Sequence, residues 1–208
     1  MVNRENTEQR IVEAAKEVFI LKGYDGARMQ EIADAAKINK ALLHYYFRSK
    51  DKLFERVFHE VFSEAFFSIA GVLEGANTIE ELIEFFVSYY VAMLKSKPYL
   101  PNFILHEMNR NPSMVVDLIK SSGMNKSRLI QLFIRESERD DIRSFNPIHV
   151  IINVLALSIF PFVASPIIKG FIFDGNNNDF DNFIDERAQH IISFINAAVF
   201  KNTIQHEA

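Results

Sequence analysis

The stretch Met29–Lys52, MQEIADAAKINKALLHYYFRSKDK, has the apolar pattern of two short helices joined by a tight turn. Ala33 is small enough for the second helix to cross closely at Leu43, and Asn39 can cap that second helix with its side-chain oxygen. The apolar positions follow helical spacing on both sides of a break at Ile38; they are Met29, Ile32, Ala33, Ala36, Leu43 and Phe47. The stretch therefore predicts a helix-turn-helix followed by the start of a longer helix.

The residues left outside this small core are basic and polar. Between Lys37 and Lys52 the chain carries five cations and a single anion, Asp51. Such a face suits a phosphate backbone, although helix-turn-helix spacing alone is a weak signal because any pair of short packed helices imitates it. Adjacent residues on a helix point in different directions, so of Tyr45 and Tyr46 we expect Tyr45 to face outward.

The run IADAAKINKALLHYYFRSKDKLF, residues 32–54, resembles the DNA-binding signature of the TetR (tetracycline-repressor) family of transcription regulators. The upstream run RIVEAAKEVFILKGYDGA, residues 10–27, is similar to the family's first helix and stands at the usual distance. The resemblance covers the N-terminal quarter of the chain. It implies an N-terminal three-helix DNA-binding domain and a divergent helical body that binds a ligand and forms a dimer.

The chain departs from the family pattern at several positions that bear on DNA binding. Ala27 and Arg28 stand where the family usually has a hydroxyl residue, so Arg28 can replace a phosphate contact but not the helix cap. Lys37 stands where glycine is common, and we expect it to adopt a positive φ at a cost of about 1 kcal/mol. Ala41 and Leu42 replace a usual Gly-Thr pair, which removes a hydroxyl and predicts a different base preference.

Composition limits the class of protein. The 208 residues are 49% hydrophobic and include no cysteine, which excludes disulfides, thiolate metal sites and cysteine nucleophiles. The net charge is −4, yet residues 1–53 carry ten Lys and Arg against eight Asp and Glu, whereas the rest carries thirteen against nineteen. The basic charge is therefore confined to the end with the helix-turn-helix pattern. The N-terminus lacks an apolar signal core, so we expect a cytoplasmic protein with no membrane partner.

Beyond the DNA-binding motif the pattern stays helical. Ser49 can cap a long helix whose apolar pairs repeat every four residues, and Thr78 with Glu81 forms a capping box for the next helix. Asn111-Pro112 is a cap-then-proline signal for a helix that we expect to run through Ile134, with a kink at Gly123. We predict an all-α chain with a DNA-binding domain at 1–52 and a helical effector-binding and dimerisation domain at 53–208.

The last two long helices resemble the family's dimerisation pair. The run that follows Asn146-Pro147 is apolar on nearly every side, which exceeds what one small subunit can bury. We therefore predict a two-fold homodimer through both helices. The interface residues predicted from the apolar pattern are Ile151, Leu155, Phe183, Ile191 and Ile195.

The body offers a mostly apolar set with a few polar groups, the usual make-up of a small-molecule pocket. Its predicted ligand-binding residues are Phe62, Phe66, Phe86, Tyr90, Met93, Phe103, His106 and Asn153. The pair His106-Glu107 lacks the second histidine of a metalloprotease motif, and a lone histidine on an apolar helix is more often a hydrogen-bonded core or pocket residue. Since no nucleophile motif or phosphate-binding loop occurs, we predict no enzymatic activity, no cofactor and no metal.

The sequence thus predicts a ligand-responsive repressor that a small, largely apolar effector releases from a palindromic operator. The alternative is a helical small-molecule carrier whose basic head serves another anionic partner. Cations on the second helix of the motif and at the start of the next favour DNA, because backbone phosphates lie at those places in such complexes. The predicted DNA-binding residues are Arg28, Gln30, Lys37, Asn39, Lys40, Ala41, Leu42, His44, Tyr45 and Lys50.

Overall fold

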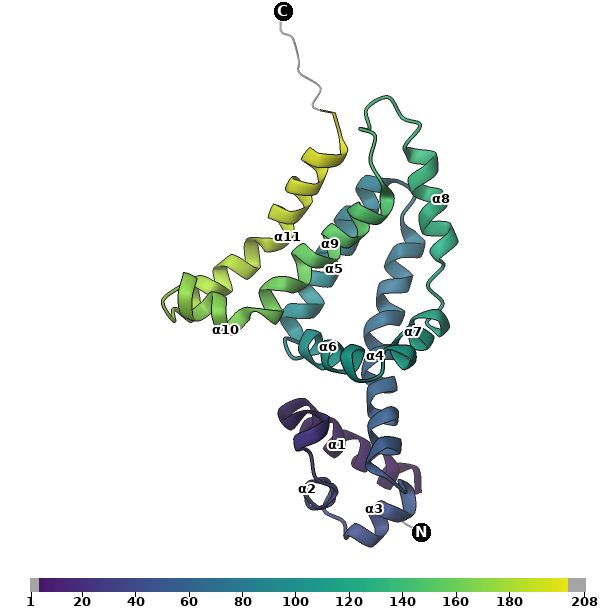
Figure 1. Cartoon of the computed structure of the whole chain (residues 1–208), viewed down its shortest axis with the longest axis vertical. Helices are drawn as coiled ribbons and strands as arrows, with labels where there is room; N and C mark the ends of the chain where they lie inside the picture. The colour runs from purple at the N-terminus through teal and green to yellow at the C-terminus, as the bar shows by residue number, and fades with distance from the viewer. Residues whose placement is uncertain (1–3, 202–208) are drawn as a thin grey trace, which may run out of the picture. The chain divides into compact units, whose positions relative to one another are not determined.

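The computed structural model describes residues 4–201, and its regular secondary structure in that range is helical (Figure 1). This confirms the all-α class. The chain divides into two compact units. The N-terminal unit holds the chain up to Phe66 together with Phe103–Ile119, and the C-terminal unit holds Phe67–Asn102 together with the chain from Lys120. The domain boundary between residues 52 and 53 stays a prediction.

The N-terminal unit contains the helix-turn-helix and the helices that pack on it. They are α1 (Arg4–Gly26), α2 (Met29–Ala35), α3 (Lys40–Tyr46), most of α4 (Lys50–Gly75), most of α6 (Leu100–Arg110) and most of α7 (Pro112–Ser121). Phe19, Phe54 and Phe58 are fully buried between these helices. Gly23 has φ 67°, a left-handed conformation that suits glycine, so the regular part of α1 ends there.

Helix starts agree with the caps that the sequence predicts. Asn39 accepts from the backbone of Leu42 at 2.8 Å, and the hydroxyl of Ser49 accepts from the backbone of Lys52 at 3.2 Å. The hydroxyl of Thr78 likewise accepts from the backbone of Glu81 at 3.2 Å. Each cap satisfies an amide that the first helical turn leaves without a partner, so these boundaries are set locally.

The C-terminal unit is a packed group of helices with an apolar core. Its elements are α5 (Ile79–Ser96), α8 (Lys126–Glu136), α9 (Pro147–Val163), α10 (Ser165–Ile167), the π-helix η1 (Ile168–Ile172) and α11 (Asn177–Val199). Helix α11 packs against α5 and α9, and residues from all three build the core. Asn146 caps α9 through a 2.9 Å bond from the backbone of Ile148, as its cap-then-proline signal predicts.

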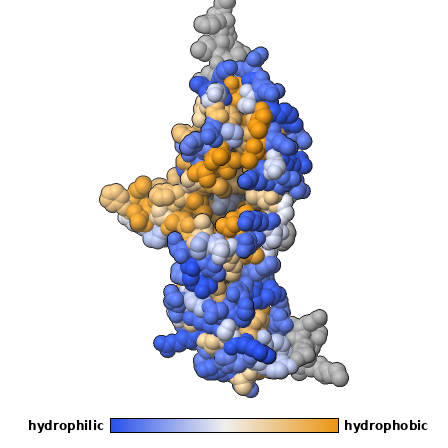
Figure 2. All heavy atoms as spheres, turned by 45° about the vertical axis from the view of Figure 1, so that its right-hand side comes forward, coloured by the Kyte–Doolittle hydropathy of each residue, from blue (hydrophilic) through white to orange (hydrophobic). Residues whose placement is uncertain are grey.

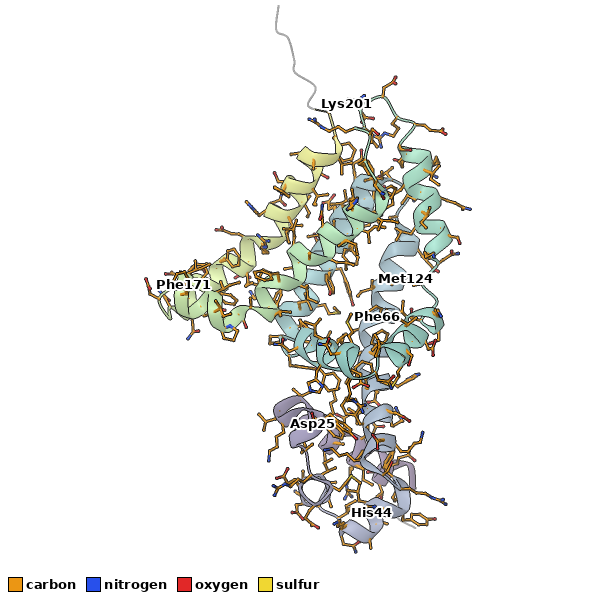
Figure 3. All side chains as sticks on the ribbon, viewed as in Figure 1. Asp25, His44, Phe66, Met124, Phe171 and Lys201 are labelled. Atoms are coloured by element: carbon orange, nitrogen blue, oxygen red, sulfur yellow. The ribbon has the colours of Figure 1, made fainter. Side chains whose placement is uncertain are left out.

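Two predicted helices are broken in the structure. The helix expected from Pro112 through Ile134 is two helices, α7 and α8, because Gly123 adopts φ 82° and ends the first rather than kinking it. The apolar run after Pro147 ends as an α-helix at Val163 and continues through α10 and η1. Phe171 is 83% exposed at the tip of this segment (Figure 3), and Figure 2 shows apolar surface gathered over it.

Within residues 4–201 the hydropathy of individual helices falls short of a membrane span. Only the bent pair Pro147–Val163 and Ser165–Ile172, which turns through 60°, has the length and composition for one when both parts are taken together.

Two features hold the loop after α8 in place: the ion pairs of Arg139, and an isolated antiparallel bridge between Ile142 and Phe200. The Arg139 guanidinium lies 2.7 Å from Asp141, 2.8 Å from Glu80 and 2.9 Å from Glu136. The hydrogen bonds that Arg139 donates to these carboxylates, above all to Asp141, raise the pKa of Arg139. The loop after α8 is thereby tied to α5 and to the end of α11.

Candidate nucleic-acid interface

The small core of the N-terminal unit decides which residues of α2 and α3 remain on the surface. Ile32, Ala33 and Leu43 are completely buried, as the apolar pattern predicts. Because Ala33 carries a single methyl group, α2 and α3 can pack closely at this point. The other faces of both helices are left to solvent.

The predicted DNA-binding residues lie on that outer surface. Leu42 is 37% exposed and Tyr45 is 63% exposed, which confirms that Tyr45 faces outward, and Figure 3 shows His44 on the outer side of α3. Lys50 is half-buried. The exposed members are Arg28, Gln30, Lys37, Asn39, Lys40, Ala41, Leu42, His44 and Tyr45. They come from the start of α2, the turn and α3, and their contacts with DNA stay a prediction.

The turn between α2 and α3 is held from both sides. Lys37 has φ 57°, which confirms the expected positive φ, and its amide donates to the carbonyl of Asp34 at 3.0 Å. Arg10 of α1 donates to the carbonyl of Ala36 at 2.9 Å and so satisfies one of the last acceptors of α2. The turn that aims α3 is therefore fixed by α1 as well as by its own backbone.

The start of α2 lacks a side-chain cap, as the sequence predicts. Arg28 precedes the helix with extended backbone angles and makes no side-chain cap. Glu31 in the first turn forms an ion pair with Lys22 of α1 at 3.1 Å, and this hydrogen bond lowers the pKa of Glu31. A negative charge near a helix N-terminus is favourable, so Glu31 takes over part of the missing cap's role.

The first turn of α4 presents Lys50 beside the end of α1. Its ammonium lies 4.5 Å from the centroid of the Tyr24 ring and donates to the carbonyl of Asp25 at 3.3 Å. The Tyr24 hydroxyl donates to Asp51 at 2.5 Å, and this hydrogen bond raises the pKa of Tyr24. Lys50 is thus a predicted DNA contact with fixed protein neighbours.

Sequence reasoning missed a residue that completes this group. Arg110, at the end of α6, lies 4.1 Å from the centroid of the Tyr24 ring and 3.7 Å from a carboxylate oxygen of Asp51. Arg110 is far from both partners in the sequence. The signal that could have suggested it is the Glu107-x-x-Arg110 spacing, which places an ion pair on one helix face.

The predicted ligand-binding residues fall into both compact units. In the N-terminal unit Phe62 stacks on Phe66 at 3.9 Å between centroids, and Phe103 is buried. In the C-terminal unit the rings of Phe86 and Tyr90 lie 5.2 Å apart, and burial raises the pKa of Tyr90 to about 12. Four members are less enclosed: Phe66 and Met93 are half-buried, and His106 and Asn153 are exposed. The assignment of a ligand to this set stays a prediction.

The predicted dimer residues differ in their exposure. Ile191 is 1% exposed, and Ile195 is also buried in the core of its own chain, so these side chains are already covered without a partner. Their assignment to an interface stays a prediction. Ile151, Leu155 and Phe183 are half-buried. The large apolar side chains exposed on α9 and α11 are Ile148, Ile152, Phe160 and Phe194.

In the part of the chain that the structure describes, no three His, Asp or Glu side chains are arranged to hold a metal ion. The buried carboxylates there are accounted for by arginine: Glu107 pairs with Arg110, and Glu136 pairs with Arg139. Both pairs are explained by packing and charge compensation.

Comparison with known proteins gives matches over the helix-turn-helix and over the whole chain. The family model described as "Bacterial regulatory proteins, tetR family" matches residues 11–57. The probable HTH-type transcriptional regulator YttP of Bacillus subtilis is 25% identical over 172 residues, which are 81% of this chain and 83% of that protein. The HTH-type transcriptional repressor NicS of Pseudomonas putida is 33% identical over 91 residues, 42% of this chain and 43% of NicS.

Solved structures share the fold. The hemolysin II transcriptional regulator HlyIIR is 26% identical, has a TM-score of 0.58, and the match covers 96% of this chain and 99% of that one. A protein from Saccharomonospora viridis, described as a transcriptional regulator in complex with choline, has a TM-score of 0.68 at 18% identity. That match covers 95% of this chain and 100% of the other.

Proposed function

Because this chain belongs to the TetR family of bacterial regulatory proteins, we propose that it binds a palindromic operator as a homodimer and represses transcription until a small, largely apolar effector releases it. Members of this family regulate transcription by binding DNA and are not enzymes. Binding to chromosomal DNA would make the protein cytoplasmic.

The observation that carries the proposal is the outer face of α3 and its flanks. Lys37, Lys40 and His44 are exposed there, while the apolar residues of the same two helices are buried. Phosphate contacts supply affinity and orientation, and side chains on the recognition helix read base edges in the major groove. The surface has both components, since Ala41, Leu42 and Tyr45 lie among the cations.

The dimer is supported by the exposed apolar side chains of α9 and α11. Ile152 and Phe160 on α9 and Phe194 on α11 are more than half exposed, which a monomer rarely tolerates in such number. A two-fold dimer presents two recognition helices to successive major grooves about 34 Å apart, so the operator would be an inverted repeat. Repression rather than activation is supported by the name of the Pseudomonas relative, a transcriptional repressor.

The effector is proposed from the aromatic character of the helical body. Phe62 and Phe66 in the N-terminal unit provide apolar surface, and Phe86 and Tyr90 in the C-terminal unit provide apolar surface with one hydroxyl; such a composition suits a small apolar molecule with few polar groups. The Saccharomonospora protein indicates that a chain with this fold can hold a small molecule.

Selection of binding sites from random duplex DNA tests the proposal. We expect the full chain to enrich an inverted repeat and the affinity for it to fall steeply with salt. Lys50→Ala should reduce the steepness of the plot of log affinity against log salt concentration by about one unit. Lys126→Ala on the exposed start of α8 is the matched control and should leave the slope unchanged.

Absence of any enriched site, with binding that is indifferent to sequence and salt, would contradict DNA regulation. The carrier alternative would then be tested by mass spectrometry of small molecules that co-purify with the chain. A slope unaltered in Lys50→Ala would leave DNA binding intact and remove Lys50 from the contacts.

A further inference from the structure

Arg110 is anchored to its own helix by a buried carboxylate. Its Nε and Nη2 atoms donate to the two oxygens of Glu107 at 2.7 and 2.9 Å. Glu107 is 0% exposed. An ionised carboxylate that is out of contact with water requires a partner cation, so Arg110 cannot leave Glu107 without uncovering a buried charge. The position of the guanidinium therefore follows the position of α6.

The same guanidinium is part of a second group in the N-terminal unit. It lies over the rings of Tyr24 and Phe54, at 4.1 and 5.0 Å from their centroids, and 3.7 Å from Asp51. Asp51 also accepts the 2.5 Å hydrogen bond of the Tyr24 hydroxyl. One planar cation thus joins the ends of α1 and α6 to the first turn of α4, a role for which arginine is better suited than lysine.

Lys50 shares one of these neighbours, Tyr24. Its ammonium lies over the Tyr24 ring and donates to the carbonyl of Asp25. Asp51, the next residue, carries a negative charge that would repel a DNA phosphate. The Arg110 guanidinium and the Tyr24 hydroxyl both compensate this charge, which keeps the start of α4 favourable for an anion.

We propose that Arg110 is a positioning residue for DNA binding, acting through Tyr24 and Asp51 on Lys50. The proposal deepens the proposed function and rests on it. When α6 is in the position seen here, Arg110 holds the Tyr24 ring and neutralises Asp51, and Lys50 is set for a phosphate. Without this guanidinium the Tyr24 ring and Asp51 lose a partner, Lys50 is held less well, and DNA affinity falls.

The first test needs no DNA. Lysines of the full chain are converted to dimethyllysine with ¹³C-formaldehyde, which keeps their charge, and the Lys50 methyl signal is identified with Lys50→Ala. The Tyr24 ring should shift this signal away from that of exposed Lys126. We expect Arg110→Met to move the Lys50 signal and to leave the Lys126 signal in place. A Lys50 signal that is unaltered in Arg110→Met would overturn the proposal.

The second test uses the duplex selected by the wild-type chain. Arg110→Met should weaken binding roughly tenfold, and Arg110→Lys, which keeps the charge but loses the planar fork, should recover part of the loss. In the Lys50→Ala background Arg110→Met should have little further effect, because it acts through Lys50. If Arg110→Met instead weakens binding by the same factor in Lys50→Ala as in wild type, the two losses are independent. That result would indicate a merely structural role and overturn the proposal.

Tyr24→Phe keeps the test decisive if Arg110→Met fails to fold. This variant removes only the hydroxyl that bonds to Asp51, and it should weaken binding in wild type but not in Lys50→Ala. Equal effects in both backgrounds would contradict the proposal. If wild type selects no duplex, the proposed function fails while the methyl signal of Lys50 still decides whether Arg110 positions it.

Discussion

Leu42 is an apolar side chain on the surface that we propose for DNA binding. It is exposed on α3, directly before the buried Leu43 in the sequence and between Lys40 and His44. In the major groove the apolar feature that distinguishes base pairs is the methyl group of thymine. Leu42 therefore suits a contact with thymine, in place of a hydrogen bond from the hydroxyl usual in the family.

Replacement of thymine by uracil in the selected duplex tests this contact, because it removes one methyl group and no hydrogen bond. At one position of each half-site, we expect the replacement to weaken the free energy of binding by about 0.8 kcal/mol, which is roughly fourfold in Kd. Leu42→Ala should bind the thymine and uracil duplexes equally. Equal sensitivity in wild type and Leu42→Ala would assign the methyl contact to another residue.

Tyr90 makes stability depend on pH in the alkaline range. Burial raises its folded pKa to about 12, against about 10 in an unfolded chain. Between these values the unfolded chain has released the phenol proton and the folded chain has kept it, so rising pH favours unfolding. Urea unfolding at pH 10, 11 and 12 measures the free energy of unfolding. We expect it to fall with pH more steeply in the wild type than in Tyr90→Phe, by about 1.4 kcal/mol per pH unit. Parallel declines in the two proteins would contradict this assignment.

Within helix α9, Pro161 leaves the carbonyl of Leu157 without its usual amide donor, because proline has no N–H. Arg187 of α11 supplies the donor, with Nη2 at 3.1 Å and Nε at 3.4 Å from that carbonyl oxygen. Burial lowers the pKa of Arg187. The hydrogen-bond donor that α9 lacks is thus supplied by a side chain of α11, and this contact fixes how α9 and α11 align.

A double-mutant cycle tests this repair. Arg187→Met should destabilise the chain by about 1–3 kcal/mol, because the Leu157 carbonyl loses its partner. Pro161→Ala restores an N–H within α9, so Arg187→Met should be less harmful in that background, by about 1 kcal/mol. Urea unfolding of the four proteins measures the coupling. A zero coupling energy would mean that the hydrogen bond contributes nothing to stability.

Helix starts were predictable from the sequence and several helix ends were not. A cap such as Asn39 or Asn146 depends on its own side chain and an amide within three residues, so local sequence contains all the information. A glycine such as Gly123 is compatible with either a kink or an end. The choice depends on what the following segment packs against, which local sequence does not specify.

For the whole molecule, we expect the same substitution to have different effects at an exposed and at a buried isoleucine. Ile152 is 56% exposed on α9, and Ile191 is buried on α11. If the chain dimerises through these helices, Ile152→Asp should give a folded monomer with weak operator binding. Ile191→Asp should unfold the chain instead, because it places a carboxylate in the core. Sedimentation and circular dichroism separate the two outcomes, and a fully dimeric Ile152→Asp would move the interface elsewhere.

The exposed surface of α3 and its flanks could be predicted from sequence because its residues lie within one short stretch. The group that supports it could not, since Arg110 meets Tyr24 and Asp51 only through folding. The dimer residues stay a prediction, because helical periodicity marks which side of α11 is apolar but not whether the cover is the same chain or a second one. For Ile191 and Ile195 the cover is the same chain.

The bridge between Ile142 and Phe200 offers a place for a covalent lock. Arg143 N donates to the carbonyl of Val199 at 2.9 Å and Lys201 N to that of Asp141 at 2.8 Å, so the two bridged residues are a non-hydrogen-bonded antiparallel pair. The α-carbons of such pairs lie about 4.5 Å apart, within the range of disulfides. Since the chain has no cysteine, a single engineered cross-link here would form without competing thiols and would close a ring of about 60 residues, worth about 4 kcal/mol by the loss of chain entropy in the unfolded state.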